Sequence, residues 1–330
     1  VDRFDANAYL YVTKAMDYFD LAAQGESLAE VLAKVRARTL VVSFTSDWLF
    51  TPEQSRQIVD AMLANNQRVT YCDIDSPFGH DAFLLEPERL GRLIGGHLQG
   101  TLHRERGGRS GIRVNDAPIA EAEIIEAPAQ PIEATRSRPD LACIAEWIEP
   151  GARVLDLGCG NGDLLYRLWA DKRVRGLGVE HDADSVLASA DLGIAVIHGD
   201  LERELAKFPD GSFDVVVLTQ TLQALDQPAR VIHEMLRVGR IGKTQETRAA
   251  HWRRRIALAG GRVTGRGAAG CWNDAPRERA LSLRDFLAGC RGTGIAVERV
   301  AALSPRGRRV ARWGANWRAG QAGGRLRGQE

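Results

Sequence analysis

The 330-residue sequence has few cysteines, no long apolar run and almost no net charge. Its five cysteines are scattered and lack C-x-x-C spacing, which argues against a disulfide framework or a zinc site and suits a reducing compartment. No run of about 18 apolar residues suggests a transmembrane helix. The formal net charge of +1 gives no general signal for nucleic acid. We therefore predict a cytoplasmic protein without a metal site and without membrane or nucleic-acid partners.

The chain also lacks an obvious N-terminal start signal. It opens on Val1 rather than methionine, and no basic-then-apolar leader follows. The sequence therefore predicts a processed end or the edge of a longer polypeptide, and we favour the longer polypeptide. At 330 residues there is room for two domains, each with its own core.

A glycine-rich stretch, RVLDLGCGNGDLL, stands out between Arg153 and Leu165. Apolar residues lead to Asp156, and glycines then occur at three alternating positions, a pattern typical of a buried strand, a tight turn and a helix start. Glycine permits a left-handed backbone and a close approach of N–H groups to a ligand. The first turn of a helix offers further donors to a polar or anionic group. By itself the pattern also fits a purely structural turn.

Three further apolar stretches follow at the spacing of an α/β fold. GLGVE ends at Glu180, IAVIHGD ends at Asp200, and FDVVVLTQ spans residues 213–220. Strands that are apolar throughout indicate a parallel sheet covered on both faces. An acidic side chain at the tip of the second strand is where such sheets hold ribose hydroxyls.

The sequence motifs DLGCGNG, VEHD, GDLE and FDVVVLTQTLQAL resemble those of class I S-adenosylmethionine-dependent methyltransferases. Within that class, they are similar to the motifs of the methionine biosynthesis protein MetW family. The resemblance implies a Rossmann-like domain that binds S-adenosylmethionine or S-adenosylhomocysteine, with the ribose on Glu180 and the adenine amine on Asp200. The implied cofactor-binding residues are Asp156, Gly158, Gly160, Glu180, Asp200 and Leu201.

Methyl transfer to oxygen or nitrogen would need a general base near the end of the fourth strand. Thr219, Gln220 and Thr221 stand there, and all three are poor bases. The sequence therefore favours cofactor binding without a robust methyl transfer.

The first hundred residues have a different pattern. Residues 1–37 are expected to form a solvent-facing pair of amphipathic helices. A short apolar strand at residues 38–44 then precedes a loop with Asp47, and a strand RVTYCDID precedes a loop with His80. In α/β-hydrolases the acid and the histidine of the catalytic triad follow late strands in this order, and the acid orients the imidazole. An isolated Asp and His are also compatible with surface or capping roles.

The whole segment RFDANAYLY…VVSFTSDWLFTPEQSRQIVDAM…SPFGHDAFLLE resembles homoserine O-acyltransferases of the MetX type. The resemblance implies that Asp47 is the triad acid, that His80 is the triad base and that Asp81 contacts the homoserine amino group. It also implies an acyl-coenzyme A co-substrate, either acetyl or succinyl.

No G-x-S-x-G nucleophile elbow occurs in the 330 residues. The serine is therefore expected in an upstream part or in a separate MetX subunit. Two strands with their helices cannot close a core alone, so this segment is predicted to be an incomplete hydrolase fold.

The regions around these two segments give weaker signals. Residues 101–137 are rich in Pro, Ala, Glu and Gly and are expected to form a flexible linker, with a short strand at Ala122–Ile125 as the alternative. Residues 241–250 have little apolar character, so we expect a loop or helix extension there, with a helix resuming at Leu283–Cys290. The arginine-rich stretch 306–330 is expected to be a disordered tail, although Trp313 and Trp317 would also suit nucleic-acid stacking.

Together these patterns predict an α/β chain with two functional parts. An incomplete α/β-hydrolase C-terminal segment (1–100) precedes the linker, a MetW-like methyltransferase-fold domain (138–305) and the basic tail (306–330). The predicted function is homoserine O-acylation in methionine biosynthesis, with homo-oligomerisation expected. The alternatives are an S-adenosylmethionine-sensing regulatory module, or a small-molecule methyltransferase that carries a non-functional acyltransferase remnant.

Overall fold

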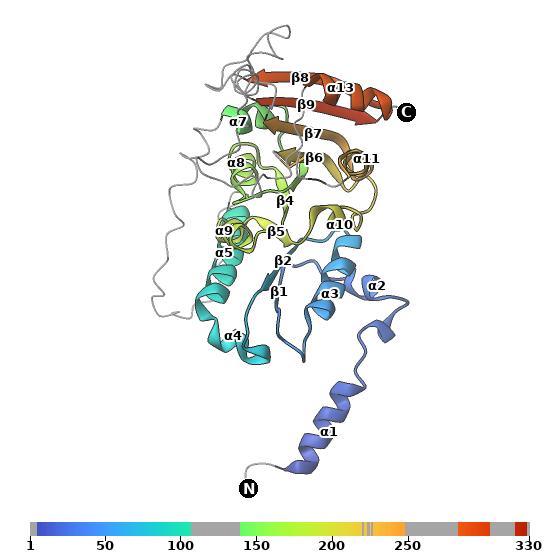
Figure 1. The fold of residues 1–330 in the computed structure, drawn as a ribbon. Coiled ribbons are helices and arrows are strands. Elements are labelled where there is room, and N and C mark those ends of the chain that lie inside the picture. The colour runs from blue at the N-terminus through green and yellow to red at the C-terminus, as the bar shows by residue number, and fades with distance from the viewer. Residues whose placement is uncertain are drawn as a thin grey trace, which may run out of the picture.

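The computed structural model describes residues 5–106, 139–219, 221–222, 225, 227–247, 283–303 and 321–328, which build one nine-stranded sheet with helices on both faces (Figure 1). The strands are β1 (Thr39–Phe44), β2 (Val69–Ile74), β3 (Arg153–Leu157), β4 (Arg175–Glu180), β5 (Ala195–His198), β6 (Phe213–Thr219), β7 (Gly239–Thr247), β8 (Ile295–Leu303) and β9 (Gln321–Gly328). The α-helices are α1 (Ala6–Asp17), α2 (Leu28–Leu32), α3 (Pro52–Ala64), α4 (Ala82–Leu85), α5 (Pro87–Arg106), α7 (Pro139–Glu146), α8 (Asp163–Lys172), α9 (Ala183–Asp191), α10 (Leu201–Leu205), α11 (Pro228–Val238) and α13 (Leu283–Gly292).

The strand order is β1-β2-β5-β4-β3-β6-β7-β9-β8. The five strands β5-β4-β3-β6-β7 are parallel and follow the 3-2-1-4-5 order of a doubly wound Rossmann-like sheet. β9 is antiparallel to both of its neighbours, β7 and β8, so the sheet is mixed at this end. The doubly wound parallel sheet predicted from the apolar stretches is confirmed.

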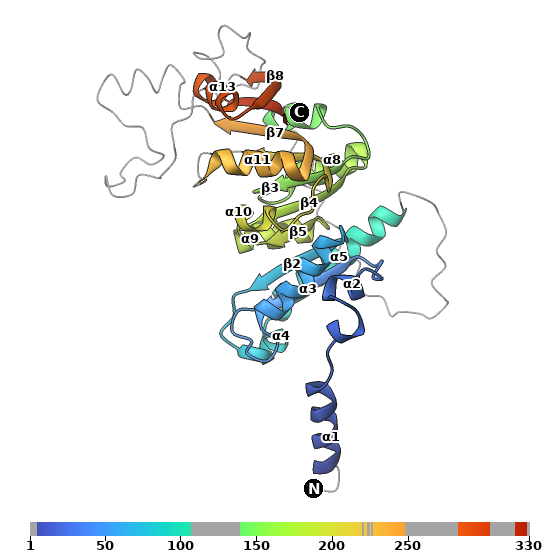
Figure 2. The same cartoon turned by 90° about the vertical axis from the view of Figure 1, so that its right-hand side faces the viewer.

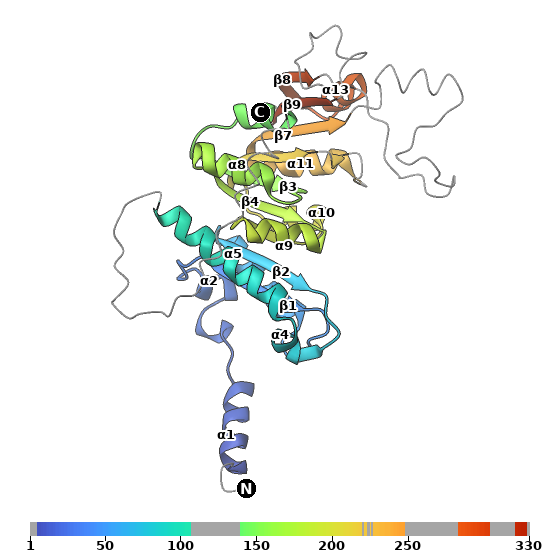
Figure 3. The same ribbon diagram turned by 90° about the vertical axis from the view of Figure 1, so that its left-hand side faces the viewer.

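The helices form a layer on each face of the sheet, as the side views show (Figures 2 and 3). One apolar cluster packs α3, α10, α11 and α13 against the sheet, and the other packs α4, α5, α7, α8 and α9 against it. The central strand β3 is buried on both faces, because Val154 packs in one apolar cluster and the next residue, Leu155, packs in the other, and both are fully covered. Burial on both sides explains the continuous apolar runs in the sequence.

The N-terminal strands β1 and β2 extend the same sheet. The register between β2 and β5 is a single residue pair, Tyr71 with Ile197. Helix α5 then packs closely on α9, where a Cβ placed on Gly96 would lie 2.0 Å from the carbonyl oxygen of Ala190. Arg92 of α5 forms an ion pair with Asp191 at the end of α9. The two strands therefore bury their faces by joining the Rossmann-like sheet along a seam between β2 and β5.

The prediction of a loop or helix extension over residues 241–250 is wrong for the residues that the structure describes. β7 is a regular strand through residue 247, paired with β6 on one side and β9 on the other. Lys243 is 1 % exposed, and its ammonium group donates a hydrogen bond to the carbonyl oxygen of Trp147. Arg248 lies outside the described residues. Strand pairing on both edges satisfies the backbone hydrogen bonds of β7. The carbonyl oxygen of Trp147 accepts a hydrogen bond from the Lys243 ammonium, the buried charge whose cost was expected to exclude a strand here.

The expected disordered tail is also wrong in part, because residues 321–328 form β9 and Leu326 is fully buried. The predicted linker starts too early, since α5 continues to Arg106. The alternative strand at Ala122–Ile125 and the tryptophans of the tail lie outside the described residues. The helix expected at Leu283–Cys290 is confirmed as α13.

Helix α1 is set apart from the sheet in all three views (Figures 1, 2 and 3). None of its residues is buried, and Tyr11 is 76 % exposed. The solvent-facing pair of helices expected over residues 1–37 is confirmed for α1 alone, because Leu32 of α2 packs against an apolar cluster of the core. A helix with so many exposed large apolar side chains is unusual for a protein surface. They are Tyr9, Leu10, Tyr11, Val12 and Met16.

Candidate active site and cofactor site

Asp47 lies in the loop that follows β1, and its carboxylate is held from several directions. One oxygen accepts the N–H groups of Leu49 and Phe50 at 2.9 and 3.0 Å, and the other is 3.0 Å from Nδ1 of His80. Burial raises the pKa of Asp47, but the hydrogen bonds from His80, Phe50 and Leu49 outweigh it and hold the pKa below the ordinary value. Asp47 therefore remains an anion that faces the imidazole.

His80 lies in the short turn Gly79–Asp81 after β2, with its ring between two aromatic side chains. The ring centroids of Phe50 and Phe83 are 5.2 and 5.8 Å from that of His80. Among the described residues its hydrogen bond is made through Nδ1, so Nε2 is left for another group. The imidazole is 34 % exposed. An acid on Nδ1 and an accessible Nε2 are the geometry of a general base.

Two hydroxyl side chains join the acid loop to the histidine loop. Thr45 donates to the carboxylate of Asp75 at 2.8 Å, and Ser46 accepts the N–H of Gly79 at 2.8 Å. Because β1 and β2 are adjacent and parallel, their following loops meet at the same edge of the sheet. Asp81 ends the turn and is exposed, so its side chain is open to solvent beside His80.

The loops that carry this pair, and helix α4 after them, have many exposed apolar side chains. Trp48 is 76 % exposed and Phe50 is 57 % exposed, although both flank a pair of polar residues. Patches of this kind mark binding or interaction surfaces. The other members are Leu49, Phe78, Phe83, Leu84 and Leu85.

The glycine loop after β3 lies at the same carboxyl edge of the sheet. Gly160 and Gly162 have φ values of +55° and +76°, which other residues rarely adopt. The hydroxyl of Ser189 on α9 donates to the carbonyl of Gly160 at 2.8 Å and closes one side of the loop. A Cβ on Gly160 would meet no atom within 4 Å, so this turn faces open space. Asp156 is buried at the end of β3, just below it.

Glu180 and Asp200 follow the next two strands, β4 and β5. One oxygen of Glu180 accepts the N–H of Gly160 at 2.8 Å, and the other accepts the N–H groups of His181 and Asp182. Asp200 caps α10 by accepting the N–H of Arg203 at 3.0 Å. The positions of both acids at the strand ends were predicted from the sequence, but these local hydrogen bonds were not. A carboxylate has about four lone-pair sites, so both residues keep acceptor capacity for a ligand.

These residues fit an adenosyl cofactor. The open turn at Gly160 has room for a ligand, and Glu180, tied to that turn, would face a ribose diol. Leu201 begins α10 and is half-buried beside Asp200. Thr219 and Thr221 lie across the loop, joined by a hydrogen bond of 2.8 Å from the Thr221 hydroxyl to the Thr219 carbonyl. Gln220 lies outside the described residues.

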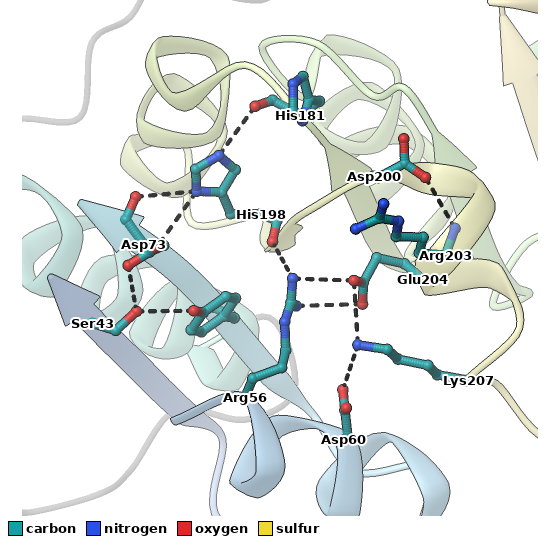
Figure 4. A network of polar contacts seen from close by, with 11 residues as sticks. Ser43, Arg56, Asp60, Asp73, His181, His198, Asp200, Arg203, Glu204 and Lys207 are labelled. Atoms are coloured by element: carbon teal, nitrogen blue, oxygen red, sulfur yellow. Dashed lines mark hydrogen bonds and ion pairs between the residues drawn. The ribbon is translucent and has the colours of Figure 1, made fainter. Parts of the chain in front are cut away.

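A polar network that the sequence did not predict lies along the seam between β2 and β5 (Figure 4). Arg56 of α3 forms an ion pair with Glu204 of α10 at 3.1 Å and donates to the carbonyl of His198 at 2.9 Å. His198 in turn contacts the backbone of Asp73 through Nδ1 and that of His181 through Nε2. Arg56 and Glu204 are 148 positions apart, so no local pattern could have linked them.

Lys207 completes the network by reaching both sides of the seam. Its ammonium lies 2.9 Å from Asp60 of α3 and 3.3 Å from Glu204. Burial raises the pKa of Glu204 more than the two cations lower it. The seam is therefore an interface held by ion pairs. Its contacts extend to His181 and His198, which lie close to Glu180 and Asp200 in the chain.

Three buried thiols lie at separate places in this architecture. Burial raises the pKa of Cys72 on β2 to about 12, and burial with the nearby carboxylates of Asp156 and Glu180 raises that of Cys159 well above its ordinary value. The pKa of Cys290 on α13 is also raised by burial. In the described residues, no three His, Cys, Asp or Glu side chains gather as metal ligands would. No helix in that part of the chain is long and apolar enough to span a membrane.

Residues 138–323, more than half of the chain, match the family described as methionine biosynthesis protein MetW. The chain belongs to the MetW family. A bifunctional methionine biosynthesis protein MetXA/MetW of Rhodopirellula baltica is 40 % identical over 246 residues, which cover 72 % of this chain and 36 % of that protein. The chain thus spans about a third of the length of that relative.

The N-terminal part has its own relatives. A homoserine O-acetyltransferase of Methanosalsum zhilinae is 56 % identical over 97 residues, 29 % of this chain and 20 % of that protein. A homoserine O-succinyltransferase of Halothiobacillus neapolitanus is 54 % identical over 99 residues, 30 % of this chain and 25 % of that protein. A resemblance to both MetX-type acyltransferases and the MetW family, as predicted from the motifs, is confirmed.

Solved structures add only a distant likeness. An S-adenosylmethionine-dependent methyltransferase of Thermotoga maritima is 15 % identical, with a TM-score of 0.43, over 60 % of this chain and 92 % of that one. A likeness at this level carries no argument about chemistry. The Rossmann-like methyltransferase fold of the MetW-family domain rests instead on its sheet order, its glycine loop and its family membership.

Proposed function

We propose that this chain supplies the acid–base pair of a homoserine O-acyltransferase and joins it to a MetW-family domain that binds S-adenosylmethionine. The observation that carries the proposal is the hydrogen bond between buried Asp47 and His80, made by two loops at the end of adjacent parallel strands. Relatives named homoserine O-acetyltransferase and O-succinyltransferase match this part of the chain. The N-terminal segment is accordingly proposed to be part of an α/β-hydrolase fold.

In the proposed reaction Nε2 of His80 takes the proton of a serine hydroxyl as the oxygen attacks the thioester carbonyl of an acyl-coenzyme A. The carbon–sulfur bond breaks, and the departing coenzyme A thiolate receives that proton. His80 then deprotonates the hydroxyl of homoserine, whose oxygen attacks the carbonyl of the serine ester. The bond from the acyl carbon to the serine oxygen breaks, the serine oxygen takes the proton back from His80, and the O-acyl product is released. Asp47 stabilises the imidazolium in both steps, and Asp81 is proposed to bind the homoserine ammonium group.

The serine is proposed to come from a part of the protein outside these 330 residues. The purified chain alone should then form no O-acylhomoserine from homoserine and either acyl-coenzyme A. The full reading frame that contains it should form product, and His80→Ala should reduce kcat by about a thousandfold or more, because the serine loses its base. Asp81→Asn should instead raise KM for homoserine. Product from the isolated chain, or full activity in His80→Ala, would reject the proposal.

The MetW-family domain is proposed to bind S-adenosylmethionine or S-adenosylhomocysteine in the open turn at Gly160. Glu180→Ala should weaken binding by about 1–3 kcal/mol, because a charge-assisted hydrogen bond to the ribose is lost. Glu149→Ala removes an exposed carboxylate elsewhere and serves as the control. Isothermal calorimetry on the folded chain measures both. A wild-type chain that binds neither compound would remove this part of the proposal.

A regulatory role is favoured by a second observation, the network at the seam. The residues that hold β2 and α3 against the domain include His198, two positions before Asp200, and its ring contacts the carbonyl of His181, which follows Glu180 (Figure 4). The proposed cofactor carboxylates and the acyltransferase segment thus share one set of contacts. We propose that cofactor binding and the position of this segment are energetically coupled.

A further inference from the structure

A cavity lies at the amino ends of the parallel strands, opposite both candidate sites. It has a volume of about 510 Å³, which suits a ligand of nucleotide size. Residues that precede or begin four parallel strands line it: Arg38 before β1, Arg68 before β2, Arg153 at the start of β3 and Arg175 at the start of β4. Asp47, His80 and the glycine loop follow the carboxyl ends of their strands, so the cavity is separate from them.

The cavity lies where the two parts of the chain meet. Leu63 and Gln67, from α3 and the turn after it, face residues of the Rossmann-like domain such as Ala195 and Phe208. β2 and β5 share one register pair, Tyr71 with Ile197, and the cavity lies towards the amino ends of the two strands. It is therefore a consequence of how the N-terminal strands join the sheet.

The charge of this cavity is strongly positive. Five arginines line it, and none of the described lining residues is an aspartate or glutamate. Arg153 is paired with Asp214 at 3.1 Å, and Arg173 lies over the ring of Trp169 at 5.8 Å. Within the described residues, Arg68 and Arg175 have no carboxylate partner, and both are exposed. Clustered guanidinium groups repel one another and are the preferred partners of phosphate.

The remaining lining suits a flat, partly polar group. Phe208 and Phe213 form an edge-to-face pair with centroids 5.4 Å apart, and the ring of Trp169 adds a third aromatic surface. Gln67 donates its amide N–H groups to the carbonyls of Leu32 and Val35. Its buried amide oxygen has no hydrogen-bond partner among the described residues. Gln67 lines the same cavity as the aromatic side chains, and an unpartnered acceptor there suits the N–H groups of a nucleobase.

We infer that this cavity binds a nucleotide with a di- or triphosphate. The phosphates lie on Arg68 and Arg175 at the mouth, and the base lies against the aromatic lining. This inference is independent of the function proposed above, since it uses neither the acid–base pair nor the glycine loop. Free adenine nucleotides and coenzyme A share the required chemistry, so each is tested separately.

Calorimetric titration of the full chain with ATP, coenzyme A and pyrophosphate tests the inference, in the presence of saturating S-adenosylhomocysteine to fill the glycine-loop site. We expect one equivalent of ATP or coenzyme A to bind, and pyrophosphate to bind at least about tenfold more weakly. The double variant Arg68→Glu/Arg175→Glu should weaken binding by about a hundredfold, roughly tenfold for each lost charge-assisted contact. A second variant, Gln67→Leu, should weaken the nucleotides but not pyrophosphate.

The matched control is Arg36→Glu/Arg230→Glu, which changes the net charge equally at two exposed arginines outside the cavity. It should bind nucleotide as the wild type does. Four results would overturn the inference. The first is no binding by a chain that is folded by circular dichroism, the second is binding that S-adenosylhomocysteine abolishes, and the third is equal weakening in the control. The fourth is pyrophosphate binding as tight as that of ATP, because the site would then recognise an anion alone.

Discussion

At the scale of single residues, Asp47 shows how the local sequence determines its chemistry. The residues that follow it, Leu49 and Phe50, turn their N–H groups onto its carboxylate, and a more distant loop supplies His80. The backbone bonds could be anticipated from an Asp at the end of a strand, because Asp commonly accepts N–H groups two or three residues ahead. The approach of His80 depends on the pairing of β1 with β2 and is a tertiary effect.

Asp47 should contribute stability that disappears in acid. Its folded-state pKa lies below the ordinary 3.8, so its contribution is present above about pH 4 and is lost as the pH falls through the folded pKa. Asp47→Asn should cost about 1–2 kcal/mol at neutral pH, and the difference from wild type should shrink towards pH 2. Urea unfolding between pH 2 and 7 measures it. Exposed Asp81→Asn is the control, and a difference for Asp47→Asn that stays constant with pH would contradict the assignment.

At the scale of elements, the sequence predicted the strands well where both faces are apolar and failed where a polar strand is buried. β3 and β6 were recognised because a run such as FDVVVLTQ can only be a covered strand. β7 was missed because Lys243 looked too costly to bury, and the carbonyl of Trp147 that receives its ammonium lies 96 positions earlier in the chain. β9 was missed because Gly and Arg carry little periodicity, while its two neighbouring strands supply the hydrogen bonds.

The crossing of α5 and α9 gives a sharp test at this scale. Gly96→Ala places a methyl group about 2.0 Å from the Ala190 carbonyl oxygen, so the helices must separate and the chain should lose about 1–3 kcal/mol. Gly95→Ala, one residue earlier on the same helix, meets nothing within 4 Å and should instead stabilise by about 0.5–1 kcal/mol. Thermal and urea unfolding of the two variants provide the comparison. Equal effects from the two substitutions would show that the helices do not pack in this way.

At the scale of the whole molecule, the N-terminal segment and the MetW-family domain share one sheet. The sequence indicated both segments and their candidate residues, because each carries its motif within a short stretch. It could not show that β2 pairs with β5 or that Arg56 meets Glu204, since such contacts join residues more than a hundred positions apart. The described contacts between the two parts lie along this seam and between α5 and α9.

The seam should therefore couple cofactor affinity to the N-terminal segment. Arg56→Ala removes the ion pair to Glu204 and the hydrogen bond to the His198 carbonyl, and it should weaken S-adenosylmethionine binding about fivefold, at the low end of measured allosteric couplings. Arg89→Ala is the matched control, because this exposed arginine of the same segment bonds the carbonyl of Asp75 away from the seam. Calorimetry compares the two variants. The coupling is absent if Arg56→Ala binds the cofactor as tightly as Arg89→Ala.

The three buried thiols can serve as internal reporters of local opening. A thiol whose pKa is far above neutrality is protonated, and only the thiolate reacts with alkylating or disulfide reagents. Each of the three thiols is unreactive towards such reagents until its surroundings open. They lie near the seam (Cys72), in the glycine loop (Cys159) and at the far end of the sheet (Cys290). The rate at which each is labelled under native conditions therefore reports the opening of one region, so motion in three parts of the molecule can be followed without introducing a probe.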